Sequence, residues 1–348
     1  MIIIRNILAL SFVINLMFGC AAQQPVERFF WPPAPDEPKV EYIGSYVTST
    51  DLKKKGSSVF SDFLGDAGGL LFSKPWGVVY SKTNGNLYVS DAAQGGLVVL
   101  DFARGKSSFR GGVLGAYGMD VDGKGRIFVS SGNTVEVLVY SANGDALFAF
   151  GRNLFKRPAG IAINDELGLI YVVDVKDHNV KVFNLAGRHL YSFGSRGGDP
   201  GEFNFPTDIA VSTKGDLVIT DTLNARVQVF SSKGDFLRTF GERGKGFRFF
   251  QFPKGVAIDS EDHIYVTDAM GSHIKIMSLD GDLLLVVGGP YASIVPGGFN
   301  LPMGIDIDGD DRIYVVDQQN KALHIFQYMN KAYLEKNPVK LPAAPTAK

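Results

Sequence analysis

From about residue 74 to residue 328, the chain consists of short runs in which β-branched or aromatic residues alternate with polar ones. Runs such as Ile170–Asp174 and Ile264–Asp268 end in an acid, and runs such as Val180–Phe183 follow them. A period of two residues is typical of half-buried β-strands. Pairs such as Asp280-Gly281 supply the positive φ of a tight hairpin. The pattern predicts antiparallel strands joined by hairpins.

This strand pattern repeats six times, and each repeat begins with a Pro-x-Gly-like step. The second strand of successive repeats ends at Asp91, Ser131, Asp174, Asp221, Asp268 and Asp317. These positions are about 40 to 50 residues apart, which is the length of one four-stranded propeller blade. We therefore predict an all-β fold, a six-bladed β-propeller of four-stranded blades. A repeated acid also indicates a role in building the blade, since a carboxylate at a strand end commonly accepts backbone N–H groups.

The last repeat has only three strands and ends at Leu323–Phe326, whereas Val40–Gly44 looks like a fourth strand without a blade. Pairing these segments closes the ring and removes the exposed edges of an open array. We expect the propeller to span residues 39–328, with the closing strand at 40–44 and the blades from 74. A loose tail at 329–348 would follow.

The repeats resemble those of the NHL-repeat family of β-propellers, and the resemblance runs from Lys74 to Tyr328. It is clearest in the fourth repeat, where the matching residues are Asp221, Asn224, Arg226, Val229 and Phe230. Ser131 departs from the family pattern, which has Asp there. Further departures, at positions where the family often has Arg, are Asn179, His273 and Ala322.

Residues 1–19 are similar to an export signal, because Arg5 precedes an apolar run of 12 residues, Ile7–Phe18. A membrane-spanning helix needs about 20 residues, so this run is too short to be one. The segment Leu16–Cys20 resembles the lipid-attachment box of bacterial lipoproteins, and Cys20 is the only cysteine of the chain. The resemblance implies a signal peptide and a lipid-anchored protein of the cell envelope.

Two details of this segment bear on its destination. Met17 and Phe18 fit the lipoprotein box less well than Gly19 does, so ordinary secretion is the alternative. Ala21 follows the cysteine, which by the same resemblance favours the outer membrane. The proline-rich residues 20–38 would then form a tether. Within it Phe29, Phe30 and Trp31 either touch the bilayer interface or pack against the propeller.

Net charge narrows the range of partners. The formal net charge is −1, so the whole molecule exerts no field that would attract nucleic acid. In a propeller, the loops between second and third strands and the loops between blades emerge on one face, which is the usual binding surface. We expect this interblade-loop face to bind a protein, peptide or glycan, and its predominance of cations favours an anionic partner. The candidate residues are Arg152, Arg157, Lys176, His178, Asn179, Arg226, Arg243, Lys245, Arg248, Phe249, Phe250 and His273. Phe249 and Phe250 could instead fill the gap between blades.

Asp208 is the one charged residue at the Gly-like position of a first strand, which makes it a candidate at the channel mouth. An alternative function follows from relatives of this fold: a hydrolase or lyase of the gluconolactonase or strictosidine-synthase-like class, using a divalent cation. None of the five histidines lies in a first strand, so we expect no three-histidine zinc site. We expect no cofactor, and the divalent cation of the enzymatic alternative is the one exception left open. Residues Asp306–Asp311 are expected to form a turn with solvated acids, and Val59–Leu64 a short amphipathic helix.

Overall fold

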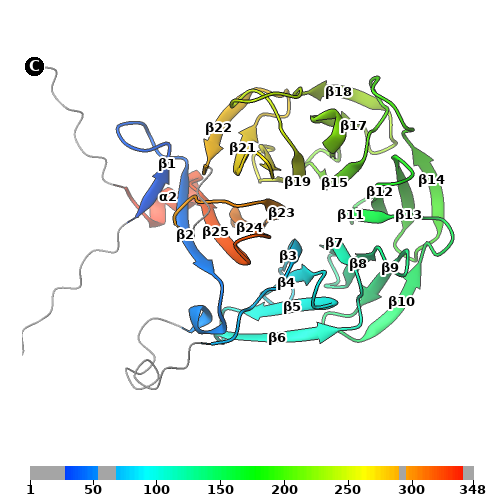
Figure 1. Cartoon of the computed structure of the whole chain (residues 1–348), viewed down its shortest axis with the longest axis horizontal. Helices are drawn as coiled ribbons and strands as arrows, with labels where there is room; N and C mark the ends of the chain where they lie inside the picture. The colour runs from blue at the N-terminus through cyan, green and yellow to red at the C-terminus, as the bar shows by residue number, and fades with distance from the viewer. Residues whose placement is uncertain (1–27, 54–67, 290–294, 340–348) are drawn as a thin grey trace, which may run out of the picture.

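The computed structural model describes residues 28–53, 68–289 and 295–339. In these ranges six antiparallel sheets are arranged as the blades of a ring (Figure 1), which confirms the predicted six-bladed β-propeller. The predicted signal peptide and Cys20 lie outside the described residues, because residues 1–27 are not among them. The same holds for the predicted helix at 59–64. No helix of the described residues is long and apolar enough to cross a membrane.

Within each blade the strands follow one another outward from the centre of the ring. The first blade contains β3 (Pro75–Ser81), β4 (Asn86–Asp91), β5 (Gly96–Asp101) and β6 (Lys106–Gly111). The second contains β7 (Ala116–Val121), β8 (Ile127–Ser131), β9 (Glu136–Tyr140) and β10 (Ala146–Phe150). The third contains β11 (Pro158–Asn164), β12 (Leu169–Asp174), β13 (Asn179–Asn184) and β14 (His189–Phe193). The fourth contains β15 (Pro206–Val211), β16 (Leu217–Asp221), β17 (Arg226–Phe230) and β18 (Phe236–Phe240). The fifth contains β19 (Pro253–Ile258), β20 (Ile264–Asp268), β21 (His273–Met277) and β22 (Leu283–Val287).

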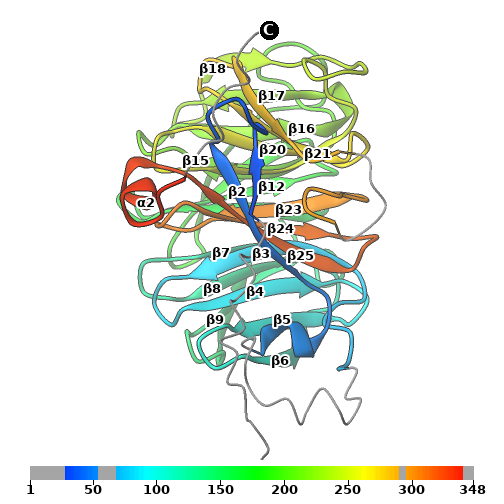
Figure 2. The same cartoon turned by 90° about the vertical axis from the view of Figure 1, so that its left-hand side faces the viewer.

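The sixth blade joins the two ends of the chain (Figure 2). Its inner strands are β23 (Pro302–Ile307), β24 (Arg312–Asp317) and β25 (Ala322–Tyr328), and its fourth strand is β2 (Val40–Tyr46). Tyr42 pairs with Phe326 and Gly44 with Ile325, which confirms closure by an N-terminal strand. A fifth strand, β1 (Phe29–Trp31), covers the outer edge of β2. The Trp31 ring packs edge-on against Phe326, so this part of the tether lies on the propeller.

The glycine of the Pro-x-Gly step is needed where neighbouring first strands approach one another. A Cβ atom on Gly77 would lie 2.4 Å from the carbonyl oxygen of Tyr117 in the next blade. On Gly118 it would lie 2.3 Å from the carbonyl oxygen of Ala159. Real Cβ atoms do not approach backbone oxygens this closely, so larger side chains would push the blades apart. The repeated step therefore sets the width of the central channel.

The acids that end the second strands build the blades. Asp174 is fully buried and accepts the backbone N–H groups of Lys156 (2.7 Å) and Arg157 (2.9 Å), in the loop that leads into the same blade. Asp91, Asp221, Asp268 and Asp317 accept N–H groups at the equivalent loop positions. In the second blade the Ser131 hydroxyl instead donates to the carbonyl oxygen of Leu114 (2.7 Å). The prediction that these acids build the blade by accepting backbone N–H groups is confirmed.

Apolar side chains fill the spaces between neighbouring blades. One cluster, for example, combines Tyr88 and Val99 of the first blade with Met119 and Val129 of the second. Buried phenylalanines of the interblade loops close the gaps near the rim, each against the glycine that follows a fourth strand; they are Phe155, Phe203, Phe250 and Phe299. Phe250 is 1% exposed, so this side chain fills the gap between blades and is not available to a partner.

Two sequence-based expectations about local structure were wrong. The segment after Tyr328 is not entirely loose, because Lys331–Lys336 form the short helix α2 and the Tyr333 hydroxyl donates to Glu41 of β2 (2.8 Å). The acids near residue 308 are not all solvated either. Asp308 accepts the Tyr314 hydroxyl (2.8 Å), and Asp311 accepts the Ser260 hydroxyl (2.8 Å). Both acids are buried, and these bonds fasten the turn to its surroundings.

Candidate functional site

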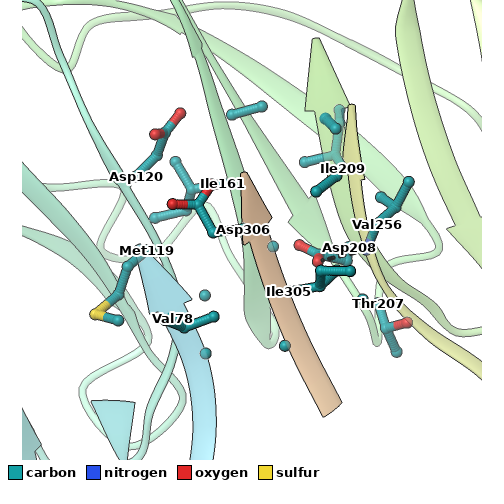
Figure 3. Close-up of a pocket in the computed structure, with 18 of the residues that line it drawn as sticks. Val78, Met119, Asp120, Ile161, Thr207, Asp208, Ile209, Val256, Ile305 and Asp306 are labelled. Atoms are coloured by element: carbon teal, nitrogen blue, oxygen red, sulfur yellow. Dashed lines mark hydrogen bonds between the residues drawn. The ribbon is translucent and has the colours of Figure 1, made fainter. Parts of the chain in front are cut away.

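The first strands of all six blades surround a central cavity of about 230 Å³ (Figure 3). Apolar side chains contribute to its wall, with Val78, Ile161, Val256 and Ile305 among the lining residues. Three carboxyl groups also line it: Asp120 on β7, Asp208 on β15 and Asp306 on β23. They lie on alternate blades, the second, fourth and sixth.

Each of these carboxyl groups joins its blade to the next one. The backbone N–H of Ile163 donates to Oδ2 of Asp120 (2.7 Å). That of Val256 donates to Asp208 (3.1 Å), and that of Tyr80 donates to Asp306 (2.7 Å). The three bonds cross the boundaries between blades two and three, four and five, and six and one. Asp208 therefore has a structural role that its position in the sequence does not reveal.

Burial controls the ionisation of this set. It raises the pKa of Asp120 to about 8, and the pKa values of Asp208 and Asp306 to about 7. Backbone N–H donors oppose the rise, while the charge of Asp306 adds to it at both other sites. A carboxyl group that keeps its proton near neutral pH is a poor cation ligand. Among the residues described, no group of three acidic, histidine or cysteine side chains could hold a metal ion.

A second cavity, of about 200 Å³, lies at the channel end that carries the interblade loops. We call it the vestibule. It shares Trp76, Thr207 and Lys254 with the wall of the central cavity, so the two are adjacent. The residues that line the vestibule are Trp76, Tyr117, Arg157, Ala159, Val175, Phe205, Thr207, Thr222, Leu223, Phe252 and Lys254.

Aromatic rings and two cations dominate the vestibule. The Arg157 guanidinium lies 5.3 Å from the centre of the Tyr117 ring, and the Lys254 ammonium lies 4.4 Å from that of Phe252. Trp76 contacts Tyr117 edge-on, with ring centres 4.9 Å apart. Within the described ranges neither cation forms an ion pair with a carboxylate. Burial, and after it the charge of Arg157, lowers the pKa of Lys254 to about 8.

The twelve candidate residues of the interblade-loop face differ in accessibility. Arg152, Lys176, Arg243, Lys245 and Arg248 are exposed, and Arg157, Asn179 and Phe249 are partly exposed. Two exposed cations already have partners, since Arg152 pairs with Glu136 (3.0 Å) and Arg243 donates to the carbonyl oxygen of Leu223 (2.7 Å). Only Arg157 of the twelve lines the vestibule.

The other four candidates, Phe250 among them, are buried. Arg226 pairs with Asp221 (2.9 Å) and donates to the carbonyl oxygens of Gly198, Asp199 and Glu202. His178 accepts the N–H of Phe205 (3.2 Å), and Nδ1 of His273 lies 2.7 Å from the carbonyl oxygen of Gly271. These side chains hold the loops and are not presented to a partner.

Sequence reasoning missed most of the vestibule, although a usable signal existed. The middle residue of every Pro-x-Gly-like step lines one or both cavities; these residues are Trp76, Tyr117, Ala159, Thr207, Lys254 and Met303. A similar signal existed for the central cavity, since Asp120 and Asp306 both lie two residues after their glycines. Comparing the repeats column by column would have shown both sets.

Comparisons with known proteins agree with this architecture. Residues 155–183, 203–230 and 250–277 match the family described as NHL repeat, so the chain carries NHL repeats within a six-bladed β-propeller. A curated relative, Protein brain tumor of Drosophila melanogaster, is 31% identical over 67 residues. That match spans 19% of this chain and only 6% of the relative.

Solved structures with the same fold include proteins of different kinds. A structural genomics protein of unknown function from Bacteroides thetaiotaomicron has a TM-score of 0.59 at 17% identity, over 76% of this chain and 71% of that one. An auxiliary nutrient binding protein from the same organism has a TM-score of 0.58 at 13% identity, over 75% and 70%. Virginiamycin B lyase from Staphylococcus aureus has a TM-score of 0.56 at 13% identity, over 73% and 95%. At these identities the likeness shows the fold alone.

Proposed function

We propose that this chain is an exported, lipid-anchored protein of the bacterial envelope whose propeller binds an anionic partner, a protein, peptide or glycan, on its interblade-loop face. The observation that carries the proposal is the set of exposed cations on that face together with the aromatic vestibule at its centre. Aromatic and arginine side chains are enriched where protein interfaces bind most strongly. The likeness to a nutrient binding protein supports a binding module at the level of the fold.

The distribution of charge supports an anionic partner. Arg243, Lys245 and Arg248 are exposed in the loop between the fourth and fifth blades. The turns of the opposite face are richer in acids, as at Asp165-Glu166 and Glu261-Asp262. Complementary charge speeds encounter and orients a partner, and its effect falls with salt. The interblade-loop face is therefore the side on which an anion would dock.

A direct test replaces Arg243, Lys245 and Arg248 together by Ser and measures binding of a polyglutamate peptide and of a polyuronate glycan to the purified protein. Exposed charge pairs each contribute modestly, so we expect affinity to fall about tenfold at low salt and the salt dependence to flatten. The matched control replaces three exposed cations of the opposite face, Arg188, Lys214 and Lys233. Equal effects of the two triple variants would place the binding face elsewhere.

The second candidate function is a hydrolase or lyase acting at the channel mouth with a divalent cation. The raised pKa of Asp208 favours it, because a carboxyl group that titrates near pH 7 suits proton transfer. The same rise weakens cation binding, and Asp208 is already bonded to Val256 of the next blade. Stoichiometric calcium or zinc that survives dialysis of the purified protein would favour this candidate over the binding module.

A further inference from the structure

We propose that the vestibule is a binding site for an aromatic carboxylate, whose acid group lies between Arg157 and Lys254 and whose ring packs against Trp76, Ala159 and Leu223. This inference rests on the proposed function and deepens it, because it assigns a ligand class to the centre of the interblade-loop face. The experiment below separates the two proposals.

The first step concerns charge. Arg157 and Lys254 are both partly buried, and neither has a carboxylate partner among the described residues. Lys254 also experiences the charge of Arg157, which destabilises its ammonium form. Two like charges held together away from bulk water are unfavourable unless a counter-charge joins them. A carboxylate between them would supply that charge and accept their N–H groups.

The second step concerns the rings. Open aromatic faces attract cationic ligands, but here Arg157 already covers Tyr117 and Lys254 already covers Phe252. A further cation would be repelled by both. A flat apolar ring can pack against the remaining surface of Trp76 and the apolar wall formed by Ala159 and Leu223. The vestibule therefore favours a ligand that carries one negative charge and one ring.

The third step concerns size. The cavity of about 200 Å³ is smaller than the roughly 300–1,000 Å³ of sites for drug-sized ligands. It suits a single ring with a short acid arm. Such a group occurs as a free small acid and as the carboxyl-terminal aromatic residue of a peptide. Both sources share the same chemistry at this site.

The experiment uses Trp76 as the reporter. The chain has two tryptophans, and the other, Trp31, packs on Phe326 in the closing blade. In the Trp31→Phe protein we expect phenylacetate to change the Trp76 emission with saturation. Phenylacetamide, which lacks the charge, and acetate, which lacks the ring, should bind at least about tenfold more weakly.

Variants test the two cations. Lys254→Met and Arg157→Gln should each weaken phenylacetate binding about tenfold, since each removes a charged donor. The matched controls are Lys176→Met and Arg152→Gln, which remove exposed cations of the same face outside the vestibule, and these should leave the affinity unchanged. Circular dichroism and thermal unfolding confirm that each variant is folded. Replacing Lys245 and Arg248, which do not line the vestibule, should not affect phenylacetate binding either, even if it weakens polyanion binding.

A second arm identifies the source of the ligand. A peptide ending in Phe that binds more tightly than phenylacetate, and loses binding when its carboxyl end is amidated, would indicate a peptide terminus. Tighter binding of phenylacetate would indicate a free acid. The proposal is overturned if neither probe saturates, if phenylacetamide binds as well as phenylacetate, or if the folded Lys254→Met and Arg157→Gln proteins bind normally.

Discussion

At the scale of single residues, the step that opens each blade assigns different tasks to adjacent positions. The glycine lets neighbouring first strands approach, as at Gly77 and Gly118, where a Cβ atom would meet the backbone of the next blade. The residue before it faces the channel mouth and varies from Trp76 to Lys254. Function can therefore change at the variable position while the ring keeps its width.

The three channel carboxyl groups predict an unusual dependence of stability on pH. Their pKa values are raised to about 7 or 8 in the folded protein, whereas an unfolded Asp titrates near about 4. The protonated carboxyl groups therefore favour the folded state. This contribution to the free energy of unfolding is complete below about pH 4 and is lost as the pH rises through 7 to 8. Each unit of raised pKa corresponds to about 1.4 kcal/mol, an upper bound for groups that face a channel.

Asp120→Asn and Asp306→Asn keep an oxygen that can accept the N–H of the next blade but cannot ionise. We expect the double variant to unfold at a higher temperature than the original protein at pH 8.5, and to lose most of that advantage at pH 5. Urea or thermal unfolding at the two pH values measures this. A variant that gains no more at pH 8.5 than at pH 5 would show that these carboxyl groups ionise normally in the fold.

At the scale of elements, the sixth blade depends on strands from both ends of the chain. Removing residues 1–44 takes away β1 and most of β2, which leaves the edge of β25 unpaired. We expect a large fall in melting temperature, because the open ring loses the pairing that closes it. Removing residues 1–27 should have no such effect. Comparable melting temperatures for the two proteins would contradict the role of β2 in closure.

An intermediate truncation separates the two N-terminal strands. Beginning the chain at Pro38 removes β1 and the pair that Arg28 forms with Glu41 (2.6 Å), but keeps β2. We expect only a small fall in melting temperature, since β1 is short and lies at the edge of the sheet. The melting temperature should therefore be highest for the chain that keeps both β1 and β2, slightly lower for the chain that keeps only β2, and much lower for the chain that lacks residues 1–44.

The repeat pattern was sufficient to predict the ring and its closing strand, because alternation of apolar residues determines which segments become strands. It did not predict β1 or α2. Both are short, and β1 pairs along an edge that no local pattern marks. The binding face was predicted from connectivity, but the vestibule was not. Residues such as Trp76 and Phe252 meet there only because the ring brings successive blades together.

At the scale of the whole molecule, the proposed lipid anchor predicts where the protein is found. If Cys20 carries the lipid, Cys20→Ser should release the chain from membranes, because the substitution removes the acylated thiol that would anchor it. Detergent phase partitioning of the original and variant proteins measures this, with Ser11→Ala in the apolar run as a control for export. A variant that remains wholly in the detergent phase would show that another feature holds the protein.

If the chain is anchored at Cys20 as proposed, the position of β1 has a mechanical consequence for the propeller. β1 is antiparallel to β2 and pairs with it at only three positions, Phe29, Phe30 and Trp31. Tension applied to the chain ahead of Arg28 reaches this short strand before it reaches the closing strand. β1 can then detach and lengthen the tether while β2 stays paired with β25. If the protein is anchored at Cys20 as proposed, β1 would thus yield to tension before the strand that closes the ring.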